Sequence, residues 1–311
     1  MKNYKEIFDA ILKNMGKVVV GQKEVIEQIM VCILTDSNAL LEGYPGLAKT
    51  LTVRTLADLM DLKFSRIQGT PDLMPSDITG TYIIEEQTGK RQFKFQPGPV
   101  FSNIVLADEI NRATPKAQSA LLEAMQEKQV TVGNQTFKLD LPFFVLATQN
   151  PIEQEGTYPL PEAQQDRFLL KINVDYPKLE EEQEIVEKYA MSKTDFRVKP
   201  ILSKNNLLSM QSLIWQVPIA NDVKNRAIKL VLATRASKDI IHYGASPRAS
   251  IGLIKAAKAR ALINGRNHVS SEDINALAFP ILRHRIILNF EAERKGMTTE
   301  DAIKTLISKV K

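Results

Sequence analysis

The chain has 311 residues, of which 44% are hydrophobic and 25% charged, a composition typical of a globular protein with room for one large and one smaller domain. Its single cysteine, Cys32, excludes an internal disulfide and a cysteine-based metal site, and it suits a reducing compartment. No run approaches the ~20 apolar residues of a membrane span and the N-terminus lacks an apolar signal core, so we expect a cytoplasmic protein without a membrane span.

The first part of the chain is predicted to form two helices. Apolar residues at positions 4, 7, 8, 11 and 12 share one face of a helix over residues 3–16. A second helix is predicted from Lys23 to about Ser37, and an apolar turn, Val18–Gln22, joins the two.

Residues 38–50, NALLEGYPGLAKT, predict a short buried strand, a glycine-bearing loop and a helix that opens at Lys49. Gly43 and Gly46 allow backbone N–H groups to turn inward around a phosphate. Lys49 would reach the outer phosphates of a nucleotide, the Thr50 hydroxyl suits a Mg²⁺ ligand, and the helix N-terminus adds partial positive charge. The sequence therefore predicts a phosphate-binding loop, or P-loop.

One position departs from the P-loop pattern G-x-x-x-x-G-K-[ST], because Ala48 stands where the last glycine is expected. Alanine is tolerable in this turn only if its backbone φ angle is negative. On this motif alone, an ordinary strand-to-helix turn without a ligand remains an alternative.

A helix over Lys49–Asp61 and a strand over Lys63–Gln68 follow the loop, and the order strand, helix, strand predicts a parallel sheet. The next segment, residues 69–102, is too long for a plain connection in a compact domain. It is predicted to hold a β-hairpin whose strands and turn are residues 81–84, 91–95 and 87–90.

The apolar run from Ile104 ends in two acids, Asp108 and Glu109, as expected for a buried parallel strand whose carboxyl end meets a site. Asp108 would hold Mg²⁺ through water, and Glu109 would orient and deprotonate the water that attacks a γ-phosphate. An acidic pair at a strand end means little by itself. Together with the P-loop, in this order, it favours a nucleotide site.

A helix over Pro115–Glu127 comes next, followed by a second hairpin and a buried strand, predicted at residues 129–132, 136–139 and 143–148. Asn150 follows this strand and could contact the γ-phosphate or position water. A turn residue in an Asn-Pro pair is the structural alternative.

A short helix over Pro161–Phe168 and a fifth strand over Leu169–Val174 complete the predicted α/β part, which we end at residue 176. Arg167 at the end of that helix is either a functional cation or the partner of a nearby acid. The rest of the chain is predicted to be helical, with helices at about residues 179–191, 204–216, 221–237, 247–264, 271–284 and 299–310.

The net charge of +5 is unevenly distributed. Residues 1–220 hold 24 Lys and Arg against 28 Asp and Glu, whereas residues 221–311 hold 17 against 8. A basic last third is compatible with nucleic acid, but no aromatic residues are interleaved with its cations, which favours a solvated helical surface.

Arg248 is an anomaly within this helical part. Ser246 is the predicted N-cap of a helix and Pro247 its first residue, which places Arg248 in the first turn. A cation at the positive end of a helix costs about 0.3–1 kcal/mol unless an anion compensates. That anion is either a nucleotide phosphate or a nearby carboxylate.

Taken together, these motifs resemble the AAA+ ATPases, and most closely the MoxR family, over most of the chain. The resemblance is carried by five strings, GYPGLAKT at 43–50, PDLMPSDITG at 71–80, ADEINRA at 107–113, ATQNP at 147–151 and DRF at 166–168. This family accepts alanine before the P-loop lysine.

The resemblance implies an α/β fold in which residues 1–176 form a P-loop AAA+ core with a five-stranded parallel sheet and two inserted β-hairpins. Residues 177–311 would form a C-terminal all-α lid domain. The resemblance also implies that Asn150 is sensor 1, Arg167 the arginine finger and Arg248 sensor 2, which act with Glu109. The implied residues for ATP and Mg²⁺ are Val19, Val20, Gly21 and Gln22 at the adenine, then Gly43, Tyr44, Pro45, Gly46, Leu47, Ala48, Lys49, Thr50 and Asp108, with Thr50 and Asp108 on the metal.

The resemblance further implies an ATP-hydrolysing remodelling or chaperone-like machine, built as a hexameric ring with the hairpins in its pore. Its partners would be a protein client and a protein with a von Willebrand factor A domain. If Arg167 serves a neighbour's nucleotide, an oligomer must form for full turnover. Two other functions stay open, a nucleic-acid-stimulated motor and a non-hydrolysing nucleotide switch, although nucleic acid is the less favoured partner.

Overall fold

The centre of the molecule is a five-stranded parallel sheet. The computed structural model describes residues 2–87, 90–151, 157–191 and 198–310. The strands lie in the order β2 (Phe64–Gln68), β5 (Ile104–Asp108), β8 (Phe144–Gln149), β1 (Ala39–Gly43) and β9 (Leu170–Val174). Because every neighbouring pair is parallel, all carboxyl ends meet at one edge of the sheet and all amino ends at the other. The predicted sheet is confirmed.

The apolar strand sequences follow from burial on both faces of this sheet. In β5, Ile104 and Leu106 pack in the core formed with helices α1 (Lys2–Val18), α2 (Lys23–Leu34) and α3 (Lys49–Leu59). Val105 and Ala107 point to the other face, where they pack with α5 (Pro115–Glu127). Successive side chains of a strand alternate between faces, so a strand covered on both sides reads as a continuous apolar run.

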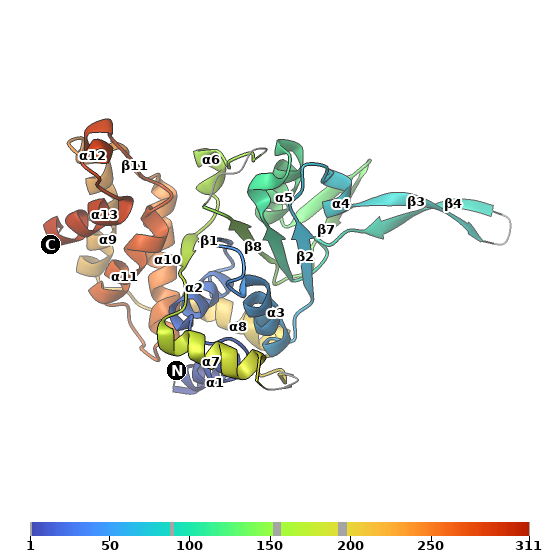
Figure 1. Cartoon of the computed structure of the whole chain (residues 1–311), viewed down its shortest axis with the longest axis horizontal. Coiled ribbons are helices and arrows are strands. Elements are labelled where there is room, and N and C mark those ends of the chain that lie inside the picture. The colour runs from blue at the N-terminus through green and yellow to red at the C-terminus, as the bar shows by residue number, and fades with distance from the viewer. Residues whose placement is uncertain (1, 88–89, 152–156, 192–197, 311) are drawn as a thin grey trace.

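Two antiparallel hairpins are inserted into this frame, as predicted. The longer one, β3 (Gly80–Gln87) and β4 (Lys90–Pro97), follows the short helix α4 (Pro75–Thr79) and projects from the body as an arm (Figure 1). Its predicted turn includes Thr88 and Gly89, which lie outside the described residues. The shorter hairpin is β6 (Gln129–Val132) and β7 (Gln135–Lys138), with Gly133 at a φ of 60° in the turn.

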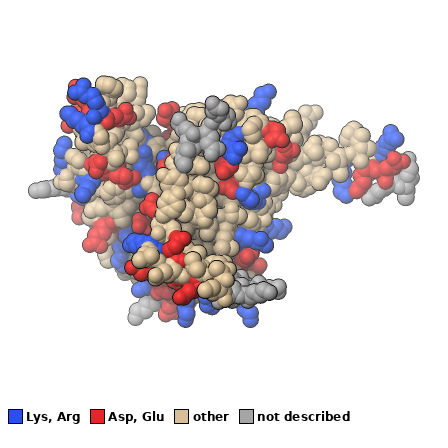
Figure 2. All heavy atoms as spheres, in the orientation of Figure 1, with Lys and Arg blue, Asp and Glu red and all other residues tan. Residues whose placement is uncertain are grey.

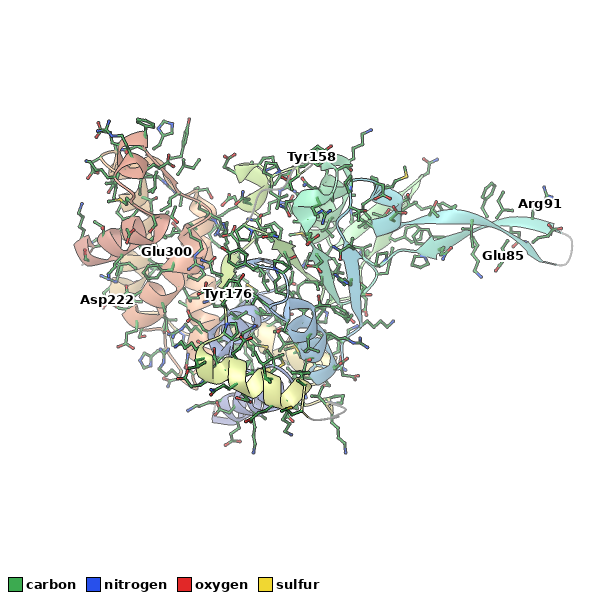
Figure 3. The ribbon with its side chains drawn as sticks, viewed as in Figure 1. Glu85, Arg91, Tyr158, Tyr176, Asp222 and Glu300 are labelled. Atoms are coloured by element: carbon green, nitrogen blue, oxygen red, sulfur yellow. The ribbon has the colours of Figure 1, made fainter. Side chains whose placement is uncertain are left out.

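The two hairpins support each other through aromatic rings. Phe95 of β4 stacks on Phe137 of β7 with ring centroids 4.2 Å apart. Tyr82 of β3 donates its hydroxyl to the Gln135 side chain over 2.8 Å. Figure 3 shows Glu85 and Arg91 farther out on the arm, beyond these contacts.

The last part of the chain is helical, as predicted, and its later helices form the left side of Figure 1. Its helices are α7 (Leu179–Tyr189), α8 (Lys204–Ile214), α9 (Asn221–Ala236), α10 (Pro247–Ile263), α11 (Ser271–Leu282), α12 (Phe290–Arg294) and α13 (Thr299–Lys309). A small antiparallel ribbon of β10 (Ile241–Tyr243) and β11 (Ile287–Leu288) accompanies them. This part is therefore mainly helical, and the expectation of an all-α domain is wrong in this detail. Strands of two or three residues are too short to show a period-2 pattern in the sequence.

The division of the chain at residue 176 stays a prediction. Helix α8 lies beyond it but packs on α2, because Leu207 and Met210 share one apolar core with Ile33. The Gln211 amide also donates to the Ile33 carbonyl over 2.7 Å. Within the described ranges, no helix is both long and apolar enough to cross a membrane.

Candidate active site

A cleft of 410 Å³ opens at the carboxyl edge of the sheet, within the size range of small-molecule sites. It lies between the loop before α3 and the ends of β2, β5 and β8. Its lining residues are Pro45, Gly46, Leu47, Ala48, Lys49, Thr50, Leu51, Arg66, Gln68, Asp108, Glu109 and Asn150. The structure thus brings the P-loop, the acidic pair and Asn150 together, although Pro45 and Asn150 are 105 positions apart in the chain.

The loop before α3 contains two left-handed backbone positions. Gly46 has a φ of 85° and Ala48 a φ of 53°. The condition that alanine needs a negative φ at this position is therefore wrong. Ala48 is the residue before the first helical turn, and its carbonyl accepts the first helical hydrogen bond, from Thr52, over 2.9 Å. Ala48 adopts this left-handed conformation despite the steric clash of its Cβ with the backbone.

Lys49 begins α3 and places its ammonium at the base of the cleft. Its Nζ donates to the Gly43 carbonyl over 2.6 Å. Burial lowers the pKa of Lys49, while the nearby charges of Asp108 and Glu109 act in the opposite direction. The partly buried ammonium attracts an anion such as a phosphate group. The two nearby acids attract the metal cation that a nucleotide carries.

Asp108 ends β5 and is held by two side chains that our sequence analysis missed. Its Oδ1 accepts the Thr148 hydroxyl over 2.6 Å, and its Oδ2 accepts both Nε and Nη2 of Arg66, over 3.1 and 2.6 Å. In the sequence, the polar residues Arg66 and Gln68 stand on either side of apolar Ile67 in a predicted strand, which indicates that this strand has one polar face. In the structure, Gln68 lies opposite Asp108 in the strand register.

Glu109 directly follows the strand and adopts a left-handed backbone, with a φ of 52°. This turn presses its carbonyl against Gly69, where an added Cβ would lie 2.1 Å from the Glu109 oxygen, so only glycine fits at position 69. Its carboxylate accepts from Arg112 over 3.0 Å and from the Gln68 amide over 3.3 Å. A carboxylate fixed at the cleft in this way can accept a proton from a bound water.

The donor set at the cleft suits a hard divalent cation. Thr50 offers a hydroxyl and Asp108 a carboxylate, both oxygen donors of the kind that Mg²⁺ prefers, and Mg²⁺ usually takes only one or two protein ligands. The residues present therefore fit the predicted metal.

The segment Val19–Gln22 lies beside the loop but lines no part of this cleft in the described residues. Val19 and Val20 are buried in or beside the core, and the Gln22 amide donates to the Leu47 carbonyl over 3.0 Å. Tyr44 stacks on Tyr176, with centroids 4.9 Å apart. The role of Val19–Gln22 at an adenine ring stays a prediction.

Arg167 and Arg248 lie elsewhere, around a hollow of 230 Å³ that also includes Asn38 and Leu169. Asn38 precedes β1 and Leu169 precedes β9, so the hollow is at the amino edge of the sheet. A five-residue strand spans about 16 Å. The two arginines are therefore separated from Lys49 of the same chain by the depth of the sheet.

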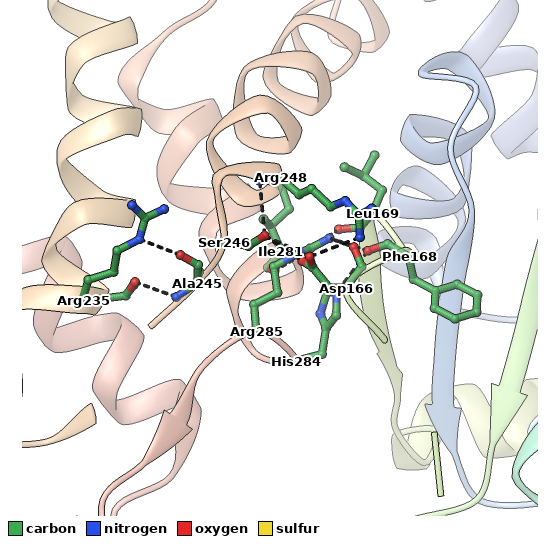
Figure 4. A network of polar contacts seen from close by, with 11 residues as sticks. Asp166, Phe168, Leu169, Arg235, Ala245, Ser246, Arg248, Ile281, His284 and Arg285 are labelled. Carbon is green, nitrogen blue, oxygen red and sulfur yellow. Dashed lines mark hydrogen bonds and ion pairs between the residues drawn. The ribbon is translucent and has the colours of Figure 1, made fainter. Parts of the chain in front are cut away.

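Asp166 organises the polar contacts at this hollow (Figure 4). Its carboxylate accepts from the almost fully buried Arg285 over 2.7 Å, from the Ser246 hydroxyl over 2.9 Å and from Arg248 over 3.4 Å. For Arg248, the nearby-carboxylate alternative is thus present in the structure. For Arg167 it is not, because no ion pair or hydrogen bond joins its guanidinium to any described residue.

Comparisons with known proteins agree with this geometry. Residues 38–170 match the model of the ATPase family associated with various cellular activities (AAA), and residues 232–306 match the model of the AAA lid domain.

Among individual proteins, Chaperone MoxR1 of Mycobacterium tuberculosis is 45% identical over 302 residues, covering 94% of this chain and 79% of that protein. Protein MoxR of Methylorubrum extorquens is 28% identical, covering 96% of this chain and 93% of that protein. A crystal structure of a candidate ATPase from Cytophaga hutchinsonii is 50% identical with a TM-score of 0.92, covering 99% of this chain and 96% of that chain.

Proposed function

The chain belongs to the MoxR family of AAA+ ATPases and hydrolyses nucleotide, and from that premise we propose that its cleft binds ATP with Mg²⁺ to drive a remodelling machine. The observation that carries the proposal is the convergence of Lys49, Thr50, Asp108, Glu109 and Asn150 on one cleft. These motifs are far apart in the chain. If the loop before α3 were an ordinary strand-to-helix turn without a ligand, nothing would require the acidic pair and Asn150 to lie beside it.

Each residue has a proposed role that its position at the cleft supports. Lys49 binds the outer phosphates, and Thr50 and Asp108 would hold a Mg²⁺ ion, which would supply positive charge to the phosphates when bound. Glu109 accepts the proton of a water whose oxygen attacks the γ-phosphorus, while the bond to the ADP oxygen breaks. Asn150 orients that water, and Gln68 keeps the Glu109 carboxylate at the cleft.

We propose that Arg167 and Arg248 act on the nucleotide of a neighbouring copy. Both lie at the amino edge of the sheet, and Lys49 of the same chain lies at the other edge. In a head-to-tail assembly, one copy's amino edge meets the next copy's carboxyl edge, and such contacts form a ring when the rotation between copies closes. A hexameric ring is the assembly that the family resemblance implies.

The assembly acts on protein clients in this proposal, in the cytoplasm, and works with a partner that carries a von Willebrand factor A domain. The projecting β3–β4 arm supports a client-contacting role, since Ile84 and Phe93 face each other across its strands and are both exposed. The nucleic-acid motor has no support in the comparisons, and we do not propose it.

Two variants test the active site. Lys49→Ala should lose ATP binding, because the cleft then lacks its phosphate-facing cation. Glu109→Gln should bind ATP and barely hydrolyse it. Calorimetry with Mg·ATP measures nucleotide binding, and phosphate release measures hydrolysis. Wild-type turnover in Glu109→Gln would remove the general-base role.

Mixed assemblies test the proposed action between copies. Arg167→Ala should lower turnover by roughly 10³ to 10⁵ while it keeps nucleotide affinity. Mixing it with Glu109→Gln should restore part of the turnover, because the second variant supplies Arg167 to the intact cleft of the first. If mixtures stay as inactive as the separate variants, Arg167 does not act between copies.

A further inference from the structure

Helix α7 is amphipathic, but none of its residues is buried. Its inner side rests on the last turn of α1, where Lys188 Nζ donates to the Gly16 carbonyl over 2.9 Å and the Tyr189 hydroxyl donates to the Val18 carbonyl. Its outer side carries two large apolar residues one heptad apart, Leu179 at 71% and Val186 at 48% exposure. The helix therefore presents an apolar stripe that nothing in the described chain covers.

Acidic residues border this stripe. Glu182 lies on one flank, and Glu180 and Glu187 lie on the other, at positions that helical periodicity places beside the two apolar residues. All three are exposed. Figure 2 shows acidic atoms gathered over α7 on the face turned toward the viewer. We call this surface, Leu179, Val186 and the three glutamates, the α7 face.

A second surface has the same build with the opposite charge. Trp215, directly after α8, is 66% exposed, and Ile251 on α10 is 57% exposed. Lys255 Nζ lies 4.9 Å from the centroid of the Trp215 ring, and Lys258 Nζ donates to the Trp215 carbonyl over 3.1 Å. We call these four residues the tryptophan face. Lys255 and Lys258 also border a cavity of 370 Å³ beside the indole.

The two faces lie at the two edges that a head-to-tail assembly joins. The α7 face adjoins the nucleotide side, where Glu181 packs against Gly21 and Tyr176 stacks on Tyr44 of the P-loop. The tryptophan face adjoins the arginine side, since Ile251 and Lys255 line the same hollow as Arg167 and Arg248. A contact that brings Arg167 to a neighbour's cleft also brings the tryptophan face to that neighbour's nucleotide side, which α7 adjoins.

We infer that the α7 face of one copy docks on the tryptophan face of the next copy in the assembly. The inference rests on the proposed action of Arg167 between copies, which sets which edges meet. An apolar centre of tryptophan and isoleucine against leucine and valine, bordered by lysines against glutamates, has the anatomy of a specific protein interface. The occupant of each face is thus a second copy of this chain.

Charge exchange between the faces is the decisive experiment. Lys255→Glu with Lys258→Glu, or Glu182→Lys with Glu187→Lys, should each weaken self-association by at least about tenfold, because like charges then meet. A chain with all four substitutions should recover the wild-type assembly. Analytical ultracentrifugation with Mg²⁺ and a non-hydrolysable ATP analogue measures the mass. An equimolar mixture of the two double variants should also assemble, since every interface in an alternating ring is then complementary.

Matched controls separate this effect from net charge and from folding. Lys229→Glu with Lys304→Glu makes the same change in charge at exposed lysines outside both faces and should assemble as wild type does. Trp215→Ser and Leu179→Ser remove the apolar centre of each face without a change in charge, and each should weaken assembly by about tenfold. Circular dichroism establishes that each variant is folded.

Wild-type assembly by either double variant overturns the inference, and so does dissociation of both without recovery in the fourfold variant. A wild-type chain that stays single overturns it as well. The Arg167→Ala mixing experiment reports separately on the proposed function. If mixing restores turnover while charge exchange fails, the copies cooperate through other surfaces. If charge exchange succeeds without restored turnover, the interface stands and the role of Arg167 fails.

Discussion

Ala48 is the residue at which the P-loop carries backbone strain. Its φ of 53° is a left-handed conformation that costs a non-glycine residue roughly 1–2 kcal/mol. The turn keeps this conformation because the neighbouring residues fix it. Thr52 donates both its N–H and its hydroxyl to the Ala48 carbonyl, and Gln22 holds the Leu47 carbonyl.

We therefore predict that Ala48→Gly raises the free energy of unfolding by roughly 0.5–1 kcal/mol, since relief of the Cβ clash exceeds the added flexibility of the unfolded chain. Urea denaturation measures it. Ala10→Gly in the middle of α1 is the control and should lower stability by about 1 kcal/mol. Equal losses in both variants would contradict the account.

His284 is a buried base next to the arginine side. Its Nε2 lies 3.1 Å from the Phe168 carbonyl, and its buried Nδ1 has no hydrogen-bond partner among the described residues. Burial, and then the charge of Arg285, lowers the pKa of His284 well below its ordinary value. The folded protein thus keeps this ring neutral at pH values where the unfolded chain protonates it.

The consequence is a loss of stability in acid. Above about pH 6.5 the ring is neutral in both states; as the pH falls below it, the unfolded chain alone gains the proton. Unfolding should then become easier by up to about 1.4 kcal/mol per pH unit from this group. His284→Gln should flatten the stability profile between pH 6.5 and 5. The exposed His268→Gln is the control, and equal profiles for both variants would contradict the prediction.

Among the elements, the β3–β4 arm depends on its neighbour hairpin for support. Phe95 and Phe137 stack with an interplanar angle of 12°, and Phe101 meets Phe137 edge-on at 6.3 Å. An aromatic pair is worth about 0.5–1.5 kcal/mol beyond the area it buries. The arm is therefore fixed at its base and carries its exposed residues outward.

Removal of this support should loosen the base of the arm. We predict that Phe137→Ala speeds amide hydrogen exchange in β3 and β4 near Tyr82 and Phe95 by roughly 2- to 10-fold. Phe93→Ala is the matched control, because that ring is 77% exposed and should leave exchange at the base unchanged. Mass spectrometry of exchanged peptides compares them. Unchanged exchange in Phe137→Ala would mean that the hairpins stand independently.

In the whole molecule, one buried acid joins helices from both ends of the chain. Asp273 of α11 has no exposed surface, and it accepts from Arg266 over 2.5 Å and from Arg260 over 2.9 Å. Arg260 of α10 also pairs with Glu27 of α2 over 3.3 Å. Burial raises the pKa of Asp273, but the hydrogen bonds from Arg266 and Ser270 outweigh it, so the net shift is downward.

We predict that Asp273→Asn lowers the free energy of unfolding by about 3 kcal/mol, at the low end for a broken buried pair because both guanidinium groups are partly exposed. Glu27→Gln removes only the outer pair and should cost at most about 1 kcal/mol. Urea denaturation near neutral pH compares them. Similar losses in the two variants would show that burial of Asp273 adds nothing.

The sequence by itself determined the parts that local pattern controls. Apolar runs and turn residues predicted the five sheet strands and both hairpins, and α5 has the bounds that were expected. The P-loop, the acidic pair and Asn150 were expected at strand ends, and parallel strands place their carboxyl ends at one edge. Their convergence followed from local sequence once the sheet was parallel.

Tertiary structure alone decided the rest, because it depends on contacts between residues distant in the chain. The strand order places Thr148 and Arg66 against Asp108, and no local pattern encodes that order. The left-handed Ala48 is held by other segments against its own preference. Arg167 and Arg248 meet at the amino edge because α10 contacts the residues just before β9, where Ser246 donates to Asp166 and Gly252 lies against Leu169, and neither segment encodes this contact locally.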